Sequence, residues 1–115
     1  MVVHSKVLIV GAGVAGLSCG RYLRDKGVDC AIIDKGRGVG GRLATRRHEA
    51  ARFDHGAPCV QFSSHAELQF WHDALKALNP LRAPSAMEAG AWILPAGVNQ
   101  LAKDLAKDLP IHCEE

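Results

Sequence analysis

Hydrophobic and polar positions alternate with different periods along the chain, and the clearest pattern lies in the first third. Residues 6–10 are a short apolar run of the strand type, and a helical pattern starts directly behind them, inside a glycine-rich turn. Charged residues gather toward the end of this helix, and Gly27 is a natural C-terminal stop. Residues 28–33 then form a second, largely buried apolar run. This order predicts a βαβ unit with parallel strands.

A second helical pattern occupies the middle of the chain. It starts at a capping box formed by Ser64 and Glu67, and Asn79-Pro80 breaks it. The apolar residues that recur at helical spacing in between are Leu68, Trp71, Leu75 and Leu78. We interpret them as core positions and not as a cofactor box. An aromatic substrate cage of Phe70, Trp71 and Trp92 is the alternative, but two tryptophans in separate elements usually anchor a core. Proline and glycine make residues 79–91 a predicted loop.

A last amphipathic helix is predicted near the end of the sequence. Its apolar side carries Val98, Leu101, Ala102, Leu105 and Leu109, and charged residues occupy the other side. Pro110 ends this helix, and residues 111–113 are expected to begin another strand. We therefore divide the chain into a βαβ part at 1–62, a helix and loop at 63–91, and a return helix with the start of a strand at 92–115.

The turn between the first strand and the first helix has the glycine spacing GxGxxG. Gly11 allows the tight turn, and Gly13 lets the backbone approach a pyrophosphate. Gly16 permits close packing of the helix on the strand. The pyrophosphate would lie at the positive N-terminus of the helix, and we count Ala15 with this binding segment. Three glycines alone are weak evidence, but a strand, a helix and a second strand in register with them predict a dinucleotide site.

An acidic residue ends the second strand. Asp34 lies eighteen residues beyond Gly16, where the ribose of a bound dinucleotide would lie. An ionised carboxylate there can accept hydrogen bonds from both ribose hydroxyls, and each such bond contributes about 1.5–3 kcal/mol.

A second glycine cluster follows the acid and indicates which dinucleotide binds. Amides freed by Gly40 and Gly41 can cradle another part of a phosphate chain, and Arg42 adds a fork of donors suited to phosphate oxygens. A nicotinamide dehydrogenase does not need this cluster, so it favours FAD. The alternative is a flexible basic surface loop, either solvated or contacting nucleic acid. The cations that fit this alternative are Lys35, Arg37, Arg42, Arg46 and Arg47.

Residues 34–45 resemble the flavin-dependent amine oxidoreductases, and within them the renalase-like branch. In that family the ribose-binding acid is followed by Gly-Gly-Arg and then Ser or Thr, matched here by Gly40, Gly41, Arg42 and Thr45. The renalase-like branch also has lysine directly after the acid and Arg-Gly ahead of the glycine pair. Lys35, Arg37 and Gly38 stand at those places.

Two further segments extend the resemblance. Residues 53–57 read FDHGA, and the resemblance implies that this stretch, with His55, Gly56 and Ala57, runs beside the flavin. His55 would be a hydrogen-bond partner or a local cation there, and the alternative is a purely structural histidine. Residues 92–109 match the family's Pro-Gly segment and following helix more loosely, because Ala96 stands before Gly97.

Length sets a limit on what the chain can do. A chain of 115 residues is one domain or less, and complete members of such flavin families are much longer. We therefore expect an α/β fold, a Rossmann-type FAD/NAD(P)-binding domain with a parallel sheet, present here as an incomplete N-terminal portion.

Composition fits an ordinary soluble protein, with 48% hydrophobic and 23% charged residues and a formal net charge of +2. We expect neither a membrane nor a nucleic-acid partner, but a small-molecule substrate. Four scattered cysteines without CxxC spacing are interpreted as reduced core or near-core thiols, which predicts a cytoplasmic protein. Six scattered histidines predict no metal site.

The expected function is that of the FAD-binding part of a flavin-dependent oxidoreductase. The resemblance implies noncovalent FAD and hydride transfer from an amine or from NAD(P)H, with oxygen as acceptor. No catalytic residue can be named. Two alternatives stay open: an NAD(P)-dependent dehydrogenase, in which Lys35 and Arg37 meet a 2′-phosphate, and a short noncatalytic nucleotide-binding module.

Overall fold

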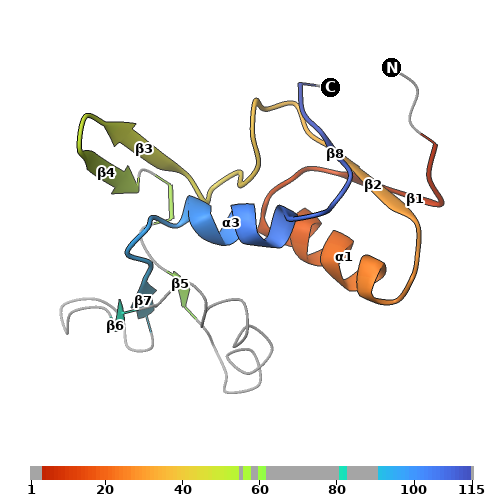
Figure 1. Ribbon diagram of the computed structural model, residues 1–115, viewed down its shortest axis with the longest axis horizontal. Coiled ribbons are helices and arrows are strands. Elements are labelled where there is room, and N and C mark those ends of the chain that lie inside the picture. Colours follow the sequence, from red (N-terminus) through yellow and green to blue (C-terminus); the bar gives the residue numbers. More distant parts are fainter. Residues whose placement is uncertain (1–3, 55, 58–59, 62–80, 83–90, 115) are drawn as a thin grey trace. The chain divides into compact units, whose positions relative to one another are not determined.

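A computed structural model describes residues 4–54, 56–57, 60–61, 81–82 and 91–114 (Figure 1). The chain forms two compact units. Unit 1 comprises Met1–Arg42 and Ala102–Glu115, and unit 2 comprises Leu43–Leu101. The predicted segments 1–62, 63–91 and 92–115 stay predictions, and the helix expected between Ser64 and Leu78 lies outside the described residues.

Unit 1 is built on a parallel sheet of three strands, β1 (Val7–Val10), β2 (Cys30–Ile33) and β8 (Ile111–His112). The order is β1-β2-β8, and both pairings are parallel. Figure 1 shows these strands side by side with α1 beside them. The predicted α/β class with a parallel sheet is confirmed, and so is a strand within residues 111–113.

Helix α1 (Val14–Asp25) joins β1 to β2 and ends as the sequence predicts. Gly27 adopts a left-handed conformation with φ +73°. The amide of Gly27 donates to the carbonyl of Arg24, and the amide of Val28 donates to the carbonyl of Leu23, each at 2.9 Å. This pair of bonds is a Schellman motif, which a glycine permits because it has no Cβ.

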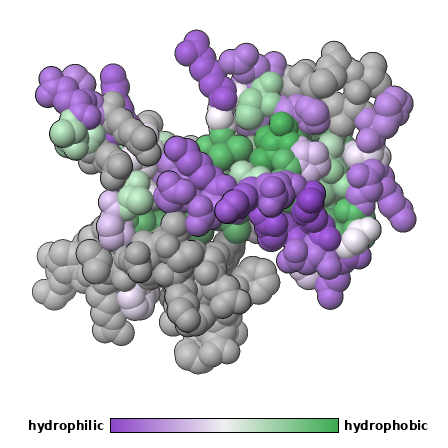
Figure 2. Space-filling model, viewed as in Figure 1, coloured by the Kyte–Doolittle hydropathy of each residue, from purple (hydrophilic) through white to green (hydrophobic). Residues whose placement is uncertain are grey.

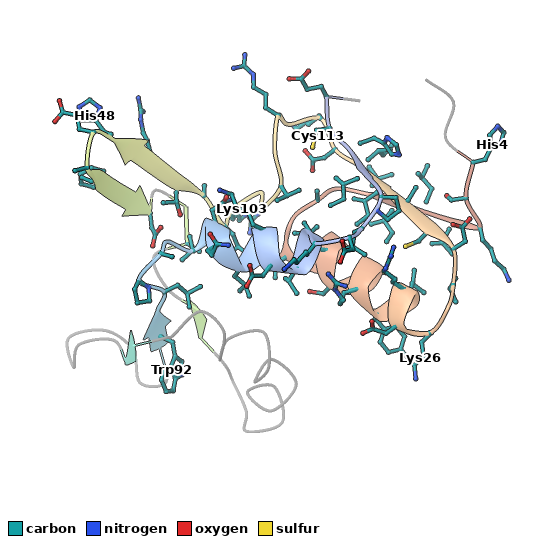
Figure 3. The ribbon with its side chains drawn as sticks, in the orientation of Figure 1. His4, Lys26, His48, Trp92, Lys103 and Cys113 are labelled. Atoms are coloured by element: carbon teal, nitrogen blue, oxygen red, sulfur yellow. The ribbon has the colours of Figure 1, made fainter. Side chains whose placement is uncertain are left out.

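One side of α1 packs on the sheet at very short range. Leu17 and Ile32 are fully buried, and a Cβ added to Gly20 would lie 2.8 Å from Cδ1 of Ile32. The opposite side of the helix is open to solvent. Tyr22 is 56% exposed, and the ammonium group of Lys26 lies 5.6 Å from the centre of its ring (Figure 3). Tyr22 therefore does not contribute to the core of unit 1.

The two longer strands of the sheet differ in burial. Residues 30–32 of β2 are buried, as expected for an internal strand. Strand β1 alternates instead, with Leu8 53% and Val10 79% exposed. In the space-filling view of Figure 2, hydrophobic residues gather over the strands of unit 1 and hydrophilic residues lie along α1.

Unit 2 contains a hairpin that the sequence patterns do not reveal. Strands β3 (Thr45–His48) and β4 (Ala51–Asp54) pair antiparallel, with Thr45 opposite Asp54 and the turn at residues 49–50. His48 stands at the tip (Figure 3). Arg46 and Arg47 therefore belong to a strand, not to a flexible basic loop.

A small antiparallel sheet completes the described strands of unit 2. It consists of β5 (Val60–Gln61), β7 (Ala91–Ile93) and β6 (Leu81–Arg82), in that order. Strand β6 lies within residues 79–91, which were predicted as a loop, and corrects that prediction at these two positions. A strand of two residues is too short to show an alternating pattern, so only pairing with β7 reveals it.

Helix α3 (Asn99–Ala106) is capped at its N-terminus by side chains of the hairpin. The amide of Val98 donates to Oδ1 of Asp54, and the amide of Asn99 donates to Oγ1 of Thr45, both at 3.1 Å. The Thr45 hydroxyl in turn donates to Asp54 at 2.7 Å. Two otherwise free helix donors are satisfied in this way.

Burial of Val98, Leu101, Ala102 and Leu105 confirms most of the apolar side predicted for the last helix. Leu109 is half-buried and lies beyond α3, which ends at Ala106 and not at Pro110 as predicted. At its C-terminal end, within unit 1, Arg21 of α1 donates through Nη2 to the carbonyl of Leu105 at 3.0 Å and to the carbonyl of Lys107. A cation at this position supplies hydrogen bonds to carbonyls at the end of the helix and interacts favourably with the negative end of the helix dipole.

We expect Arg21→Ala to lower the free energy of unfolding by about 1.5 kcal/mol, the lower end for a charge-assisted bond, because the contacts are partly exposed. Arg24→Ala is the matched control, since Arg24 is an exposed arginine on the same helix. Denaturant unfolding measures both variants. Equal losses in the two variants would contradict the capping role of Arg21.

Candidate dinucleotide-binding site

Two loops meet where β1 and β2 end, at the carboxyl edge of the parallel sheet. The first runs from Gly11 to Gly16 into α1, and the second runs from Asp34 to Arg42. Ligands of open α/β sheets bind at this edge, beyond the ends of the strands. All residues of both loops belong to unit 1.

The three glycines of the first loop have three different surroundings. Gly11 turns the chain with φ +107°, and its amide donates to the carbonyl of Ile33 at 2.7 Å. A Cβ added to Gly16 would collide with the carbonyl oxygen of Gly11, so Gly16 allows the close helix contact that was predicted. A Cβ added to Gly13 would meet nothing within 4 Å. Among the described residues, neither a close contact nor a positive φ explains the glycine at position 13.

The N-terminus of α1 offers free donors beside Gly13. Its N-cap is Gly13, which has no side chain to cap the helix, and the first helical bond runs from the amide of Leu17 to the carbonyl of Gly13. The first amides of a helix have no acceptor within the helix itself, and in α1 these are the amides of Val14, Ala15 and Gly16. A positive helix end whose first amides have no acceptor within the helix, with open space in front of Gly13, fits a pyrophosphate.

Asp34 is held between the two loops by backbone amides. Its Oδ2 accepts from the amide of Ala12, and its Oδ1 accepts from the amide of Gly36, each at 2.6 Å. These two bonds, helped by the charge of Lys35, lower the pKa of the Asp34 carboxyl, and desolvation opposes them. The carboxylate is therefore ionised at neutral pH, as an acceptor for ribose hydroxyls must be.

The glycine pair of the second loop packs onto the first loop. The amide of Gly40 donates to the carbonyl of Ala12 at 2.8 Å, and a Cβ added to Gly41 would lie 3.4 Å from Cα of Gly13. Both residues have positive φ, +122° and +54°. The amide of Gly40 is thus already bonded within the protein. The predicted contacts of Gly40 and Gly41 with a phosphate chain stay predictions.

The predicted basic residues lie at the surface. Lys35, Arg37 and Arg42 are all exposed. The loop that carries Lys35 and Arg37 is bonded to the residues after β8, since the amide of Glu114 donates to the carbonyl of Gly36 at 2.9 Å. Figure 3 shows Cys113 just after β8, beside this loop. The proposed roles of these cations stay predictions.

The FDHGA segment belongs to unit 2. His55 lies outside the described residues, Gly56 is exposed and Ala57 is half-buried. Their predicted contact with the flavin stays a prediction. Asp54 of the same segment caps α3, a role that sequence reasoning missed because the cap depends on a strand pairing.

Sequence reasoning also missed Ala12. Its side chain is fully buried, its amide bonds to Asp34, and its carbonyl bonds to Gly40. The only signal in the sequence is a small residue between two glycines.

Among the described cysteines, Cys30 is buried and Cys113 half-buried, as predicted. Cys19 corrects the prediction, because it lies exposed on the outer side of α1. Cys59 lies outside the described residues. In the part of the chain that the structure describes, no group of three or more potential ligands could hold a metal ion, and no helix is long and apolar enough to cross a membrane.

A parallel βαβ unit that ends in a glycine turn, a free helix N-terminus and an ionised acid defines a dinucleotide-binding domain of the Rossmann type. Comparison with known families agrees with this class. The chain belongs to the family of NAD(P)-binding Rossmann-like domains, which it matches over residues 9–75, more than half of its length.

Individual relatives are oxidising enzymes. The chain is 32% identical to acetone monooxygenase (methyl acetate-forming) from Gordonia sp. (strain TY-5), over 92% of this chain and 18% of that protein. It is 44% identical to the L-glutamate oxidase precursor of Streptomyces diastatochromogenes, over 47% of this chain and 9% of that protein. The structure of putrescine oxidase bound to putrescine matches with a TM-score of 0.54 and 29% identity, over 69% of this chain and 17% of that chain.

The chain spans less than a fifth of the length of each of these proteins. The matches to the family and to these enzymes support the predicted cofactor, noncovalently bound FAD.

Gly16→Ala is expected to destabilise the fold, because the new methyl group would force α1 away from the Gly11 carbonyl. Overpacking of this kind costs about 1–3 kcal/mol. Gly38→Ala is the control, since a Cβ at Gly38 meets nothing within 4 Å. Thermal unfolding of both variants measures the effect, and a Gly16→Ala protein as stable as Gly38→Ala would contradict the close contact.

The lowered pKa of Asp34 predicts a loss of stability in acid. A carboxyl whose pKa is lower in the folded state stabilises the fold fully above its ordinary value of 3.8, and the contribution fades as the pH falls below that value toward the lowered one. We expect the stability gap between the wild type and Asp34→Asn to be constant near neutrality and to shrink below about pH 4. Urea unfolding across this range measures the gap, and a gap independent of pH would contradict the assignment.

Proposed function

We propose that this chain is the FAD-binding part of a flavin-dependent oxidoreductase. The observation that carries the proposal is the combination at the start of α1. The helix begins directly after Gly13, its first amides have no acceptor within the helix, and Gly13 lacks the side chain that would fill the open space beside them. A pyrophosphate is the group whose charge and size suit such a place.

The remaining parts of the site fit the rest of the ADP half. Each oxygen of the Asp34 carboxylate uses one acceptor position on a backbone amide, and a further lone pair on each stays free for a ribose hydroxyl. Arg42 is exposed at the end of the second loop and carries donors for phosphate oxygens near the ribityl chain. Gly56 and Ala57, with His55, would border the flavin as the resemblance implies.

For the complete protein we propose oxidation of a small amine or of NAD(P)H. FAD would supply the redox chemistry, accepting a hydride from the substrate, and oxygen is the proposed final acceptor. Support comes from the likeness to an L-glutamate oxidase and to a putrescine oxidase bound to putrescine. Lys35, Arg37 and Gly38 add support for a renalase-like member. The part described here binds and orients the cofactor. A cytoplasmic location is also proposed, from the cysteine usage.

An NAD(P)-dependent dehydrogenase is the main rival, because the matched family is described as NAD(P)-binding. Lys35 and Arg37 are exposed and could meet a 2′-phosphate. The ionised carboxylate of Asp34 at the ribose position argues against a phosphate there, since like charges repel. A noncatalytic nucleotide-binding module is the other rival.

The visible absorbance spectrum of the purified protein tests the proposal directly. Flavin bands that leave with small molecules after acid precipitation would support noncovalent FAD, and chromatography of the released compound identifies it. A colourless protein that ignores added FAD but binds NADH or NADPH would favour the dehydrogenase. Binding without any substrate-dependent bleaching of the flavin would favour the module.

Gly13→Val should abolish retention of FAD while leaving the fold intact. The side chain would enter the place of the pyrophosphate, and because an added Cβ meets no atom of the described residues beyond its chain neighbours within 4 Å, folding should not suffer. Gly38→Val is the control for folding alone, because a Cβ there also meets nothing within 4 Å. Flavin content per protein and thermal unfolding are measured together, and a yellow Gly13→Val protein at wild-type occupancy would refute the pyrophosphate position.

A further inference from the structure

The Asp34 carboxylate has structural partners that no ligand supplies. Both oxygens accept short bonds from backbone amides, one in the first glycine loop and one in its own loop. The backbone of Asp34 is fixed as well, since its amide donates to the carbonyl of His112 at 3.0 Å. The backbone of Asp34 is therefore fixed to the sheet, while its side chain bonds to both loops.

The peptide groups of Ala12 carry the connection onward. The Ala12 amide donates to Oδ2 of Asp34, and the Ala12 carbonyl accepts from the amide of Gly40 at 2.8 Å. Gly13 and Gly40 also form an isolated parallel bridge. A single chain of bonds thus joins the end of β2, the first loop and the glycine pair of the second loop.

An ionised carboxylate suits this arrangement better than any neutral group. Both partners are N–H donors, so both side-chain atoms must be acceptors, and an asparagine offers only one acceptor atom. Glycine at position 36 leaves room for the Asp34 carboxylate in the second loop, because a Cβ added to Gly36 would lie 3.0 Å from Oδ1 of Asp34. A side chain at position 36 would crowd that oxygen.

We propose that Asp34 is a positioning residue that holds both glycine loops together before any cofactor arrives. Loops that are already ordered lose less conformational entropy on binding, so part of the affinity for a dinucleotide comes from this clamp and not from the ribose contact. The statement about affinity rests on the proposed function. The statement about the loops concerns the cofactor-free protein and does not.

Amide hydrogen exchange with single-residue resolution on the cofactor-free protein tests the clamp, comparing the wild type with Asp34→Asn. We expect exchange at Ala12 and Gly36 to accelerate about tenfold or more, the factor that corresponds to one charge-assisted bond. The decisive amide is that of Gly40, which does not touch Asp34. It should also accelerate, because its acceptor on Ala12 is no longer held.

Asp29→Asn is the matched control. Asp29 lies just before the other end of β2, and its Oδ2 accepts from the amide of Lys6 at 3.2 Å. This variant should change exchange near Lys6 and leave Ala12, Gly36 and Gly40 as in the wild type. If the Gly40 amide of Asp34→Asn exchanges at the same rate as in the wild type, the clamp is overturned, whatever the rate at Gly36.

A second measurement covers the case in which Asp34→Asn does not fold. In the wild type, protonation of Asp34 removes the charge without mutation, so the protection of Ala12, Gly36 and Gly40 should decline together as the pH falls from the ordinary value of 3.8 toward the lowered pKa of Asp34. Protection of Gly40 that is unaffected while that of Gly36 declines would contradict the coupling.

FAD titration separates this inference from the proposed function. If Asp34→Asn loosens the loops but the wild type never binds FAD, the clamp stands and the cofactor assignment fails. If Asp34→Asn binds FAD more weakly while exchange at all three amides stays unchanged, Asp34 acts through the ribose alone and the clamp is refuted.

Discussion

The contact between the Asp34 carboxylate and the Ala12 amide is the interaction on which the site depends. It joins the end of β2 to the turn that begins α1, two places that are distant in sequence and adjacent at the edge of the sheet. The contact is possible because parallel pairing of β1 with β2 brings both strand ends to the same edge. The carbonyl of Ala12 then holds Gly40, so the position of the second loop follows from that of the first.

Glycine serves three separate physical purposes in this small region. Gly11, Gly40 and Gly41 adopt positive φ values, which other residues rarely accept. Gly16 and Gly20 allow α1 to approach backbone and side-chain atoms more closely than a Cβ would permit. Gly13 has neither reason among the described residues, and the proposed pyrophosphate would account for it. This contrast separates the glycines that the fold requires from the one that the proposed function assigns to binding.

Polar side chains at the two ends of α3 show how each unit provides hydrogen-bond partners for backbone amides and carbonyls at a helix end. In unit 2, Asp54 and Thr45 of the hairpin accept from the first amides of the helix. In unit 1, Arg21 donates to the last carbonyls. Asp54 thus gives part of the FDHGA segment a structural task. A motif that resembles a flavin-contacting segment need not have every residue at the cofactor.

By itself, the sequence determined the βαβ unit, the end of α1 at Gly27, the apolar side of the last helix and the acid at the end of β2. Each of these depends on local periodicity, or on glycine or proline at one position. The tertiary structure decided the β3–β4 hairpin, the two-residue strands, the cap of α3 and the bonds of Ala12. These depend on pairing between distant segments, and strands this short carry too few residues to show a period. The same reason explains why Asp34 could be predicted as a ribose ligand, whereas its bonds to both glycine loops became visible only when those loops were folded against each other.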